Sequence, residues 1–93
     1  MYALRLNPNQ PSAWLGLGVL ARKESNTAEA VSDLSRSLEL QPTAQAYFEL
    51  GQTLAQAGRI PEALDSYRRA LQLAPDFSEA QKAVDALQRG AHP

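Results

Sequence analysis

Apolar residues recur along the chain at spacings of three and four, and proline interrupts the pattern at regular distances. The same five-residue phrase, Leu-x-Leu-x-Pro, ends at Pro8, Pro42 and Pro75, and the prolines are 34 and 33 residues apart. Proline lacks the backbone N–H and disfavours the helical conformation in the residue before it, so each phrase predicts the end of a helix. The chain is therefore a short unit that is repeated.

Within each unit the apolar positions form two blocks with the spacing of one helix face. The blocks are Trp14/Leu17/Gly18/Ala21 and Ala30/Leu34/Ser37/Leu38 in the first unit, and Tyr47/Leu50/Gly51/Leu54 and Ala63/Tyr67/Ala70/Leu71 in the second. They predict helices over residues 11–24, 28–41, 44–57 and 61–74, and a fifth stripe predicts a helix over 78–89. Each unit is thus expected to be a hairpin of two antiparallel helices.

Turn chemistry places the break inside each unit. Gly58 accepts the left-handed conformation that ends a helix, and Pro61 suits the first turn of the next helix. In the first unit Ser25 stands where the turn glycine is expected, Asn26 tolerates the left-handed region, and Thr27 is the expected helix cap. The first hairpin is expected to be the looser one.

These positions resemble the tetratricopeptide repeat, a 34-residue helix-turn-helix unit with the pattern W-x2-L-G-x2-Y, A-x3-F-x2-A, then P. The matching residues are Trp14, Leu17, Gly18, Ala30, Leu34 and Pro42, and again Tyr47, Leu50, Gly51, Ala63, Tyr67 and Pro75. The resemblance implies an all-α solenoid of antiparallel helix-turn-helix repeats. About two and a half units are expected, closed by a C-terminal capping helix.

The expected organisation is a single tetratricopeptide domain over residues 1–93. It divides into a partial repeat (1–10), two repeats (11–43 and 44–77), a capping helix (78–89) and a tail (90–93). Ala3, Leu4 and Leu6 align with the last turns of a second helix whose partner is not supplied upstream. Gln81, Asp85 and Gln88 give the last helix the polar face that the end of a solenoid needs.

Composition excludes several classes of function. The 93 residues carry a net charge of −1 and no cysteine, and the only adjacent basic pairs are Arg22-Lys23 and Arg68-Arg69. We therefore expect no nucleic-acid partner, no disulfide framework and no thiolate metal site. No apolar run approaches the length that spans a bilayer, and no secretory leader is evident, so no membrane partner and a cytoplasmic location are expected.

Catalysis finds little support in the sequence. His92 is the only histidine and is one residue from the end of the chain, and no glycine-rich phosphate loop is present. Glu62 and Asp65 are three residues apart on a helix, a spacing more typical of a solvated face than of an acid pair. The chain is predicted not to be an enzyme and to need no cofactor or metal.

The resemblance implies that the first helices of the repeats line a concave groove that binds a protein or peptide. The groove positions are Leu15, Val19, Arg22, Gln45, Phe48, Gln52 and Lys82. The large apolar residues among them could equally pack between neighbouring helices. The family's two-carboxylate clamp is not expected, because its five positions hold Leu15, Val19, Glu49, Glu79 and Ala83.

Two other functions stay open at this point. The chain could be a self-assembly module that forms a homo-oligomer through its N-terminal end, or the repeat fragment of a larger enzyme or regulator. Solution mass separates the first from a groove-binding module, and additional sequence separates the second.

Overall fold

The computed structural model describes residues 10–90, which form five α-helices and no strand. The helices are α1 (Pro11–Lys23), α2 (Thr27–Leu40), α3 (Ala44–Gln56), α4 (Ile60–Leu73) and α5 (Ser78–Gly90). The predicted helices are confirmed to within one residue at each end. Gly90 was expected in the tail and instead belongs to α5. The segment with Ala3, Leu4 and Leu6, and His92 of the tail, lie outside the described residues.

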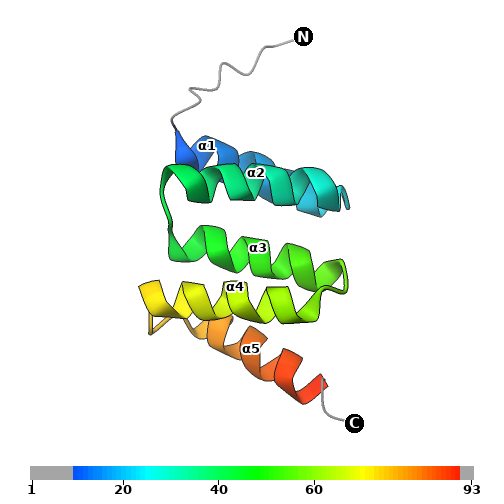
Figure 1. Ribbon diagram of the computed structural model, residues 1–93, viewed down its shortest axis with the longest axis vertical. Coiled ribbons are helices and arrows are strands. Elements are labelled where there is room, and N and C mark those ends of the chain that lie inside the picture. Colours follow the sequence, from blue (N-terminus) through cyan, green and yellow to red (C-terminus); the bar gives the residue numbers. More distant parts are fainter. Residues whose placement is uncertain (1–9, 91–93) are drawn as a thin grey trace.

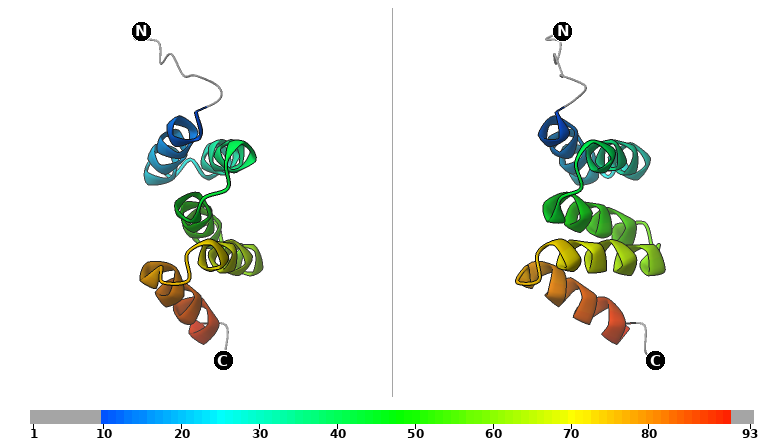
Figure 2. Two further views of the ribbon diagram at one scale, coloured as in Figure 1. Left: turned by 90° about the vertical axis from the view of Figure 1, so that its left-hand side faces the viewer. Right: turned by 60° about the vertical axis from the view of Figure 1, so that its left-hand side comes forward.

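The helices stack in chain order as antiparallel hairpins (Figure 1). α1 packs on α2 and α3 on α4, while α2 contacts α3 and α4 contacts α5. When the molecule is turned about its vertical axis from the view of Figure 1, α1, α3 and α5 lie on one side of the stack and α2 and α4 lie on the other (Figure 2, left). The all-α solenoid is therefore confirmed, and its first helices share one side.

Small residues set the close approach within each hairpin. A Cβ atom at Gly18 would lie 2.6 Å from Cγ of Leu34, and one at Gly51 would lie 2.7 Å from Cδ1 of Tyr67. Leu34 is fully buried and Tyr67 is 4 % exposed. The two helices of each unit thus meet at the same register position, as the repeated glycine predicts.

The turns follow the expected chemistry with two corrections in the first hairpin: Ser25 rather than Asn26 takes the left-handed conformation, and Asn26 rather than Thr27 caps α2. Gly58 has a φ of 81°, and Ser25 takes the same left-handed region with a φ of 63°. The cap of α2 is Asn26, whose side chain accepts a hydrogen bond from the Glu29 backbone N–H at 3.4 Å. Thr27, the expected cap, is instead the first helical residue, because Ser25 already supplies the left-handed turn and leaves Asn26 to precede the helix.

Ser37 stands where the family pattern has a small apolar residue, and its hydroxyl has a partner. The side chain is buried, and Oγ donates to the backbone carbonyl of Pro11 at 2.8 Å. Because a buried hydroxyl is costly only when it lacks a hydrogen bond, the polar residue is accommodated here. It ties the end of α2 to the start of α1.

Candidate binding surface

Two residue stripes on the first helices make up the candidate site. Leu15, Val19 and Arg22 follow one another at helical spacing on α1, and Gln45, Glu49 and Gln52 do so on α3. With Lys82 of α5, these seven residues are called the groove face. The side of the stack that carries α1, α3 and α5 can be followed in Figure 2.

A polar network joins the two stripes. Nη2 of Arg22 lies 3.1 Å from Oε1 of Glu49, and Nε2 of Gln45 donates to Oε2 of Glu49 at 2.9 Å. The side chains of the ion pair are only 20 % and 11 % exposed. A partly buried, hydrogen-bonded pair is less screened than a surface pair, so it fixes the position of α1 relative to α3.

The network also acts on the core behind it. Burial raises the pKa of the Tyr67 phenol, while Arg22 lowers it and Glu49 raises it to a smaller degree. The hydroxyl of Thr53, which is fully buried, donates to the backbone carbonyl of Glu49 at 2.9 Å. Glu49 is thus held from both its side chain and its backbone.

Sequence reasoning missed the role of Glu49. It treated the residue only as a clamp position that does not match. The available signal was that Glu49 follows Gln45 by four positions on the same helix. The corresponding position of the first unit holds Gly16 instead of an acidic residue. The ion pair with Arg22 depends on how the units stack, which the spacing along one helix does not report.

Phe48 lies between units. Its ring centroid is 5.7 Å from that of Tyr67 and 5.0 Å from that of Phe77, and it packs against the buried cluster around Leu54 and Val84. This is the alternative that the sequence left open, in which an apolar groove residue packs between neighbouring helices. Phe77 follows α4 in the loop to α5, outside any helical stripe, so the pattern of spacings did not single it out.

The remaining groove positions differ in their surroundings. Gln52 is half-buried on α3 and Lys82 is exposed on α5. Leu15 lines a hollow of about 290 Å³ between the start of α1 and the end of α2, which is completed by Pro11, Ser12, Ser37, Gln41 and Thr43. The structure brings Arg22 and Gln45 together through Glu49, and it leaves Leu15 and Val19 partly exposed beside them.

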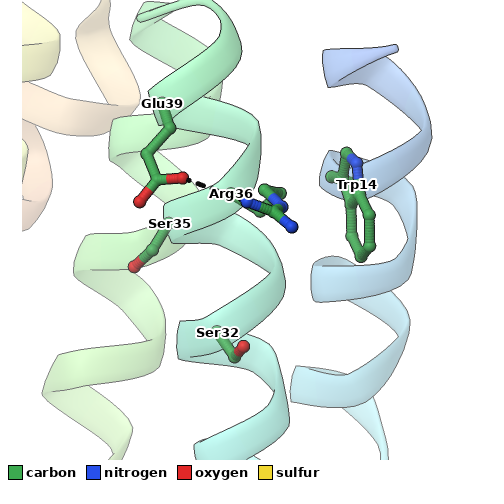
Figure 3. A pocket seen from close by; sticks show the side chains of 5 residues that line it. All are labelled: Trp14, Ser32, Ser35, Arg36 and Glu39. Atoms are coloured by element: carbon green, nitrogen blue, oxygen red, sulfur yellow. Dashed lines mark hydrogen bonds and ion pairs between the residues drawn. The ribbon is translucent and has the colours of Figure 1, made fainter. Parts of the chain in front are cut away.

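A second hollow lies on α2. It measures about 310 Å³ and is lined by Ser32, Ser35, Arg36 and Glu39 of α2 and by Trp14 of α1 (Figure 3). Arg36 points toward the Trp14 ring, 5.6 Å from its centroid, and pairs with Glu39 at 3.5 Å. These contacts pair Arg36 and Glu39, the two charged side chains of the hollow, with each other.

Other kinds of site are not indicated in the described part of the chain. Residues 10–90 contain no group of three or more His, Asp or Glu side chains placed to hold a metal ion. None of the five helices is long and apolar enough to cross a membrane.

Stacked helical hairpins with a shared side of first helices define an α-solenoid. The sequence matches the model of the tetratricopeptide repeat over residues 2–44 and 20–76, so the chain belongs to the tetratricopeptide repeat family. This confirms the resemblance seen in the sequence.

Several curated proteins are similar to most of the chain. The peroxisomal targeting signal receptors of Candida albicans and Eremothecium gossypii are 36 % and 31 % identical over 85 % and 88 % of it. The cellulose synthase operon protein C of Pseudomonas fluorescens is 31 % identical over 87 % of it. The chain spans only 14 %, 15 % and 6 % of these relatives, respectively. The similarity therefore concerns a repeat segment of much longer proteins.

Proposed function

We propose that the groove face binds a segment of a partner protein, and that the chain acts by binding rather than by catalysis. The single observation that carries the proposal is the Arg22–Glu49–Gln45 network, which holds two stripes of different units in one surface. Two relatives named as receptors for a peroxisomal targeting signal support a recognition role for repeats of this kind. The class of partner is a protein or peptide.

The groove face favours a partner segment that offers an apolar side chain and, on either side of it, backbone N–H and C=O groups that can form hydrogen bonds. Leu15, beside its hollow, and Val19 offer apolar contacts on α1. The amides of Gln45 and Gln52 can both donate to and accept from a peptide backbone. Lys82, exposed on α5, offers a positive charge to an acidic residue of the same segment. Phe48 takes a supporting role in this proposal, because it positions α3 through Tyr67 and Phe77.

The proposal is tested with a peptide selected from a random display library by the wild-type chain. The peptide is titrated while the backbone amides of the chain are followed by NMR. We expect shifts at Leu15, Val19, Gln45 and Gln52, and at least a tenfold weaker Kd for Val19→Asp, because a carboxylate in an apolar contact must be desolvated.

Ser32→Asp is the matched control, since it adds the same charge to an exposed position of α2. Thermal melts of both variants separate lost binding from lost folding. Amide shifts confined to α2, or equal affinity of the Val19 and Ser32 variants, would remove the groove face as the binding surface.

A second candidate is that the chain is the repeat segment of a larger enzyme or regulator. The observation in its favour is the small share of each relative that the chain spans. In that case the groove face recruits a substrate or regulator for a catalytic part located elsewhere. The cytoplasmic location stays a prediction under both candidates.

A further inference from the structure

The hollow beside Leu15 lies where the first unit meets the second. It measures about 290 Å³ and is lined by Pro11, Ser12 and Leu15 of α1, by Ser37 and the C-cap Gln41 of α2, and by Thr43, which precedes α3. The start of α1, the end of α2 and the connection to α3 lie together at the left of the stack in Figure 1. Because all three helices around the hollow are described, its size reflects the side chains that line it.

The same place in the second unit holds two aromatic rings. Leu15 corresponds to Phe48, 33 residues later, and Thr43, the residue before α3, corresponds to Phe77, the residue before α5. The two ring centroids lie 5.0 Å apart, so the rings pack on each other between α3 and α5. In the first unit a leucine and a threonine stand in place of these rings. The hollow is the space that the smaller side chains leave.

The walls of the hollow suit an apolar group. Oγ of Ser37 already donates to the backbone carbonyl of Pro11 at 2.8 Å, and Oγ1 of Thr43 accepts from the backbone N–H of Ala46 at 3.2 Å. Pro11 and Leu15 add apolar surface, and no charged residue lines the hollow. A charged ligand would have to give up its hydration here without an opposite charge in return, whereas an apolar side chain gains from leaving water.

The size and position of the hollow point to one aromatic side chain. An apolar cavity of about 150 Å³ in a protein core holds a benzene molecule, so about 290 Å³ has room for a ring and the atoms that attach it to a backbone. Leu15 belongs both to the wall of the hollow and to the groove face, which makes the two continuous. Aromatic residues are also those that most often anchor a bound segment in a desolvated pocket.

We propose that this hollow receives an aromatic side chain of the protein segment that binds the groove face, in the place that Phe48 and Phe77 take in the second unit. The inference rests on the proposed function and deepens it, since it names the side chain by which the first unit distinguishes one segment from another.

The chemistry of the hollow is tested without a partner, by attaching small groups at its rim. The chain has no cysteine, so Gln41→Cys gives the full 93-residue protein a single thiol beside the hollow. Gln56→Cys is the matched control at an exposed position at the end of α3. Each protein is equilibrated with equal amounts of phenethyl and isopentyl disulfides and a reducing thiol, and the adducts are measured by mass spectrometry. We expect the phenethyl adduct to exceed the isopentyl adduct by about tenfold in Gln41→Cys only.

Leu15→Phe places a ring of the chain itself in the hollow. It should abolish the phenethyl preference of Gln41→Cys, and it should raise the Kd of the display-selected peptide by about tenfold or more. Replacing the aromatic residue of that peptide by leucine should have the same effect. Leu20→Phe is the matched control, because Leu20 is an exposed leucine of α1 outside the hollow. Leu15→Phe is expected to melt at the same or a higher temperature than the wild type, since filling a hollow adds buried apolar area.

Three results would overturn the proposal. The first is equal phenethyl and isopentyl adducts in Gln41→Cys, as expected if water, an aliphatic side chain or another segment of this chain occupies the hollow. The second is a selected peptide that has no aromatic residue. The third is a Kd that Leu15→Phe leaves unchanged while Val19→Asp weakens binding, in which case the groove face binds the segment without using the hollow. Equal affinity of Val19→Asp and Ser32→Asp instead removes the groove face itself, and this inference with it.

Discussion

Arg36 places its guanidinium 5.6 Å from the centroid of the Trp14 ring, and Arg69 takes the corresponding position beside Tyr47 in the second unit. The pKa of Arg69 is raised by its hydrogen bond with Asp65 and then by Tyr47. In both units, therefore, an arginine of the second helix interacts with the aromatic residue near the start of the first. A cation over an aromatic face stabilises the Arg36–Trp14 contact by about 0.5 to 1 kcal/mol at an exposed site, whereas Arg69 interacts with Tyr47 through a hydrogen bond.

The first prediction concerns Trp14. Trp14→Ala is expected to lower the free energy of unfolding by about 3 kcal/mol, the low end for such a truncation, because the side chain is only half-buried. Trp14→Tyr should cost much less, since tyrosine occupies this position in the second unit. Urea unfolding followed by circular dichroism measures both. Equal losses for the two variants would show that ring size, rather than the shared aromatic contact, decides the stability.

The second prediction revises an expectation about Phe48. From the sequence, a concave-face position implies that Phe48→Ala changes stability little. The contacts with Tyr67 and Phe77 instead predict a loss of about 3 kcal/mol. Phe48→Leu is the control, because it keeps most of the buried apolar volume, and it should cost less than half as much. A fully stable Phe48→Ala protein would show that the three rings do not pack together in solution.

Much of this fold is encoded in short-range patterns. Helix ends follow from Pro42, Pro75 and Gly58, and the close helix crossings follow from Gly18 and Gly51. Each of these residues acts within its own helix or hairpin. The repeated pattern therefore predicts both each helix and the helix that packs against it in the same hairpin.

Contacts between units are less accessible to sequence reasoning. The Arg22–Glu49 pair joins residues 27 positions apart, and its counterpart in the next unit is apolar. Phe77 packs on Phe48 from a loop that carries no periodicity. Exposure is also a property of the stack: Leu20 and Thr53 share a register, yet one is exposed and the other is buried because only α3 has a unit before it in the described residues.

The third prediction uses the turn of the first hairpin. Ser25 has a φ of 63°, which is unfavourable for a residue with a Cβ atom. Ser25→Gly is expected to raise the free energy of unfolding by about 1 kcal/mol, and Gly58→Ser, at a φ of 81°, to lower it by about the same amount. Urea midpoints of the two variants give the comparison. A Ser25→Gly protein that is less stable than the wild type would contradict the left-handed turn.

The fourth prediction is a pH dependence. Burial, and then the neighbouring charge of Glu29, raise the pKa of the Asp33 carboxyl above its ordinary value of 3.8. A raised pKa in the folded state means that the charged form opposes folding, so the stability that protonation provides is lost as the pH rises through the folded pKa. Asp33→Ser, which introduces the residue found at Ser66, should therefore increase stability at pH 7. The increase should shrink as the pH falls and vanish below the unfolded pKa, where the carboxyl is neutral in both states. Melting temperatures from pH 2 to pH 8 test this, and a gain that is constant with pH would show that the carboxylate charge is not the cause.

The last prediction concerns how α1 is held on α3. Arg22 pairs with Glu49 across the first unit boundary, whereas the corresponding residues at the second boundary are Ala55 and Ala83, which pack on the core cluster. Arg22→Ala and Glu49→Ala each leave a partly buried charge without its partner, so each is expected to cost about 1 to 3 kcal/mol. The double variant reproduces the apolar boundary and should cost less than the sum of the single variants, with a coupling of about 1 to 2 kcal/mol. Urea unfolding of all four proteins at low and high salt completes the cycle. Because the side chains are largely buried, the coupling should persist in salt, and strictly additive losses would show that the pair does not join the two units.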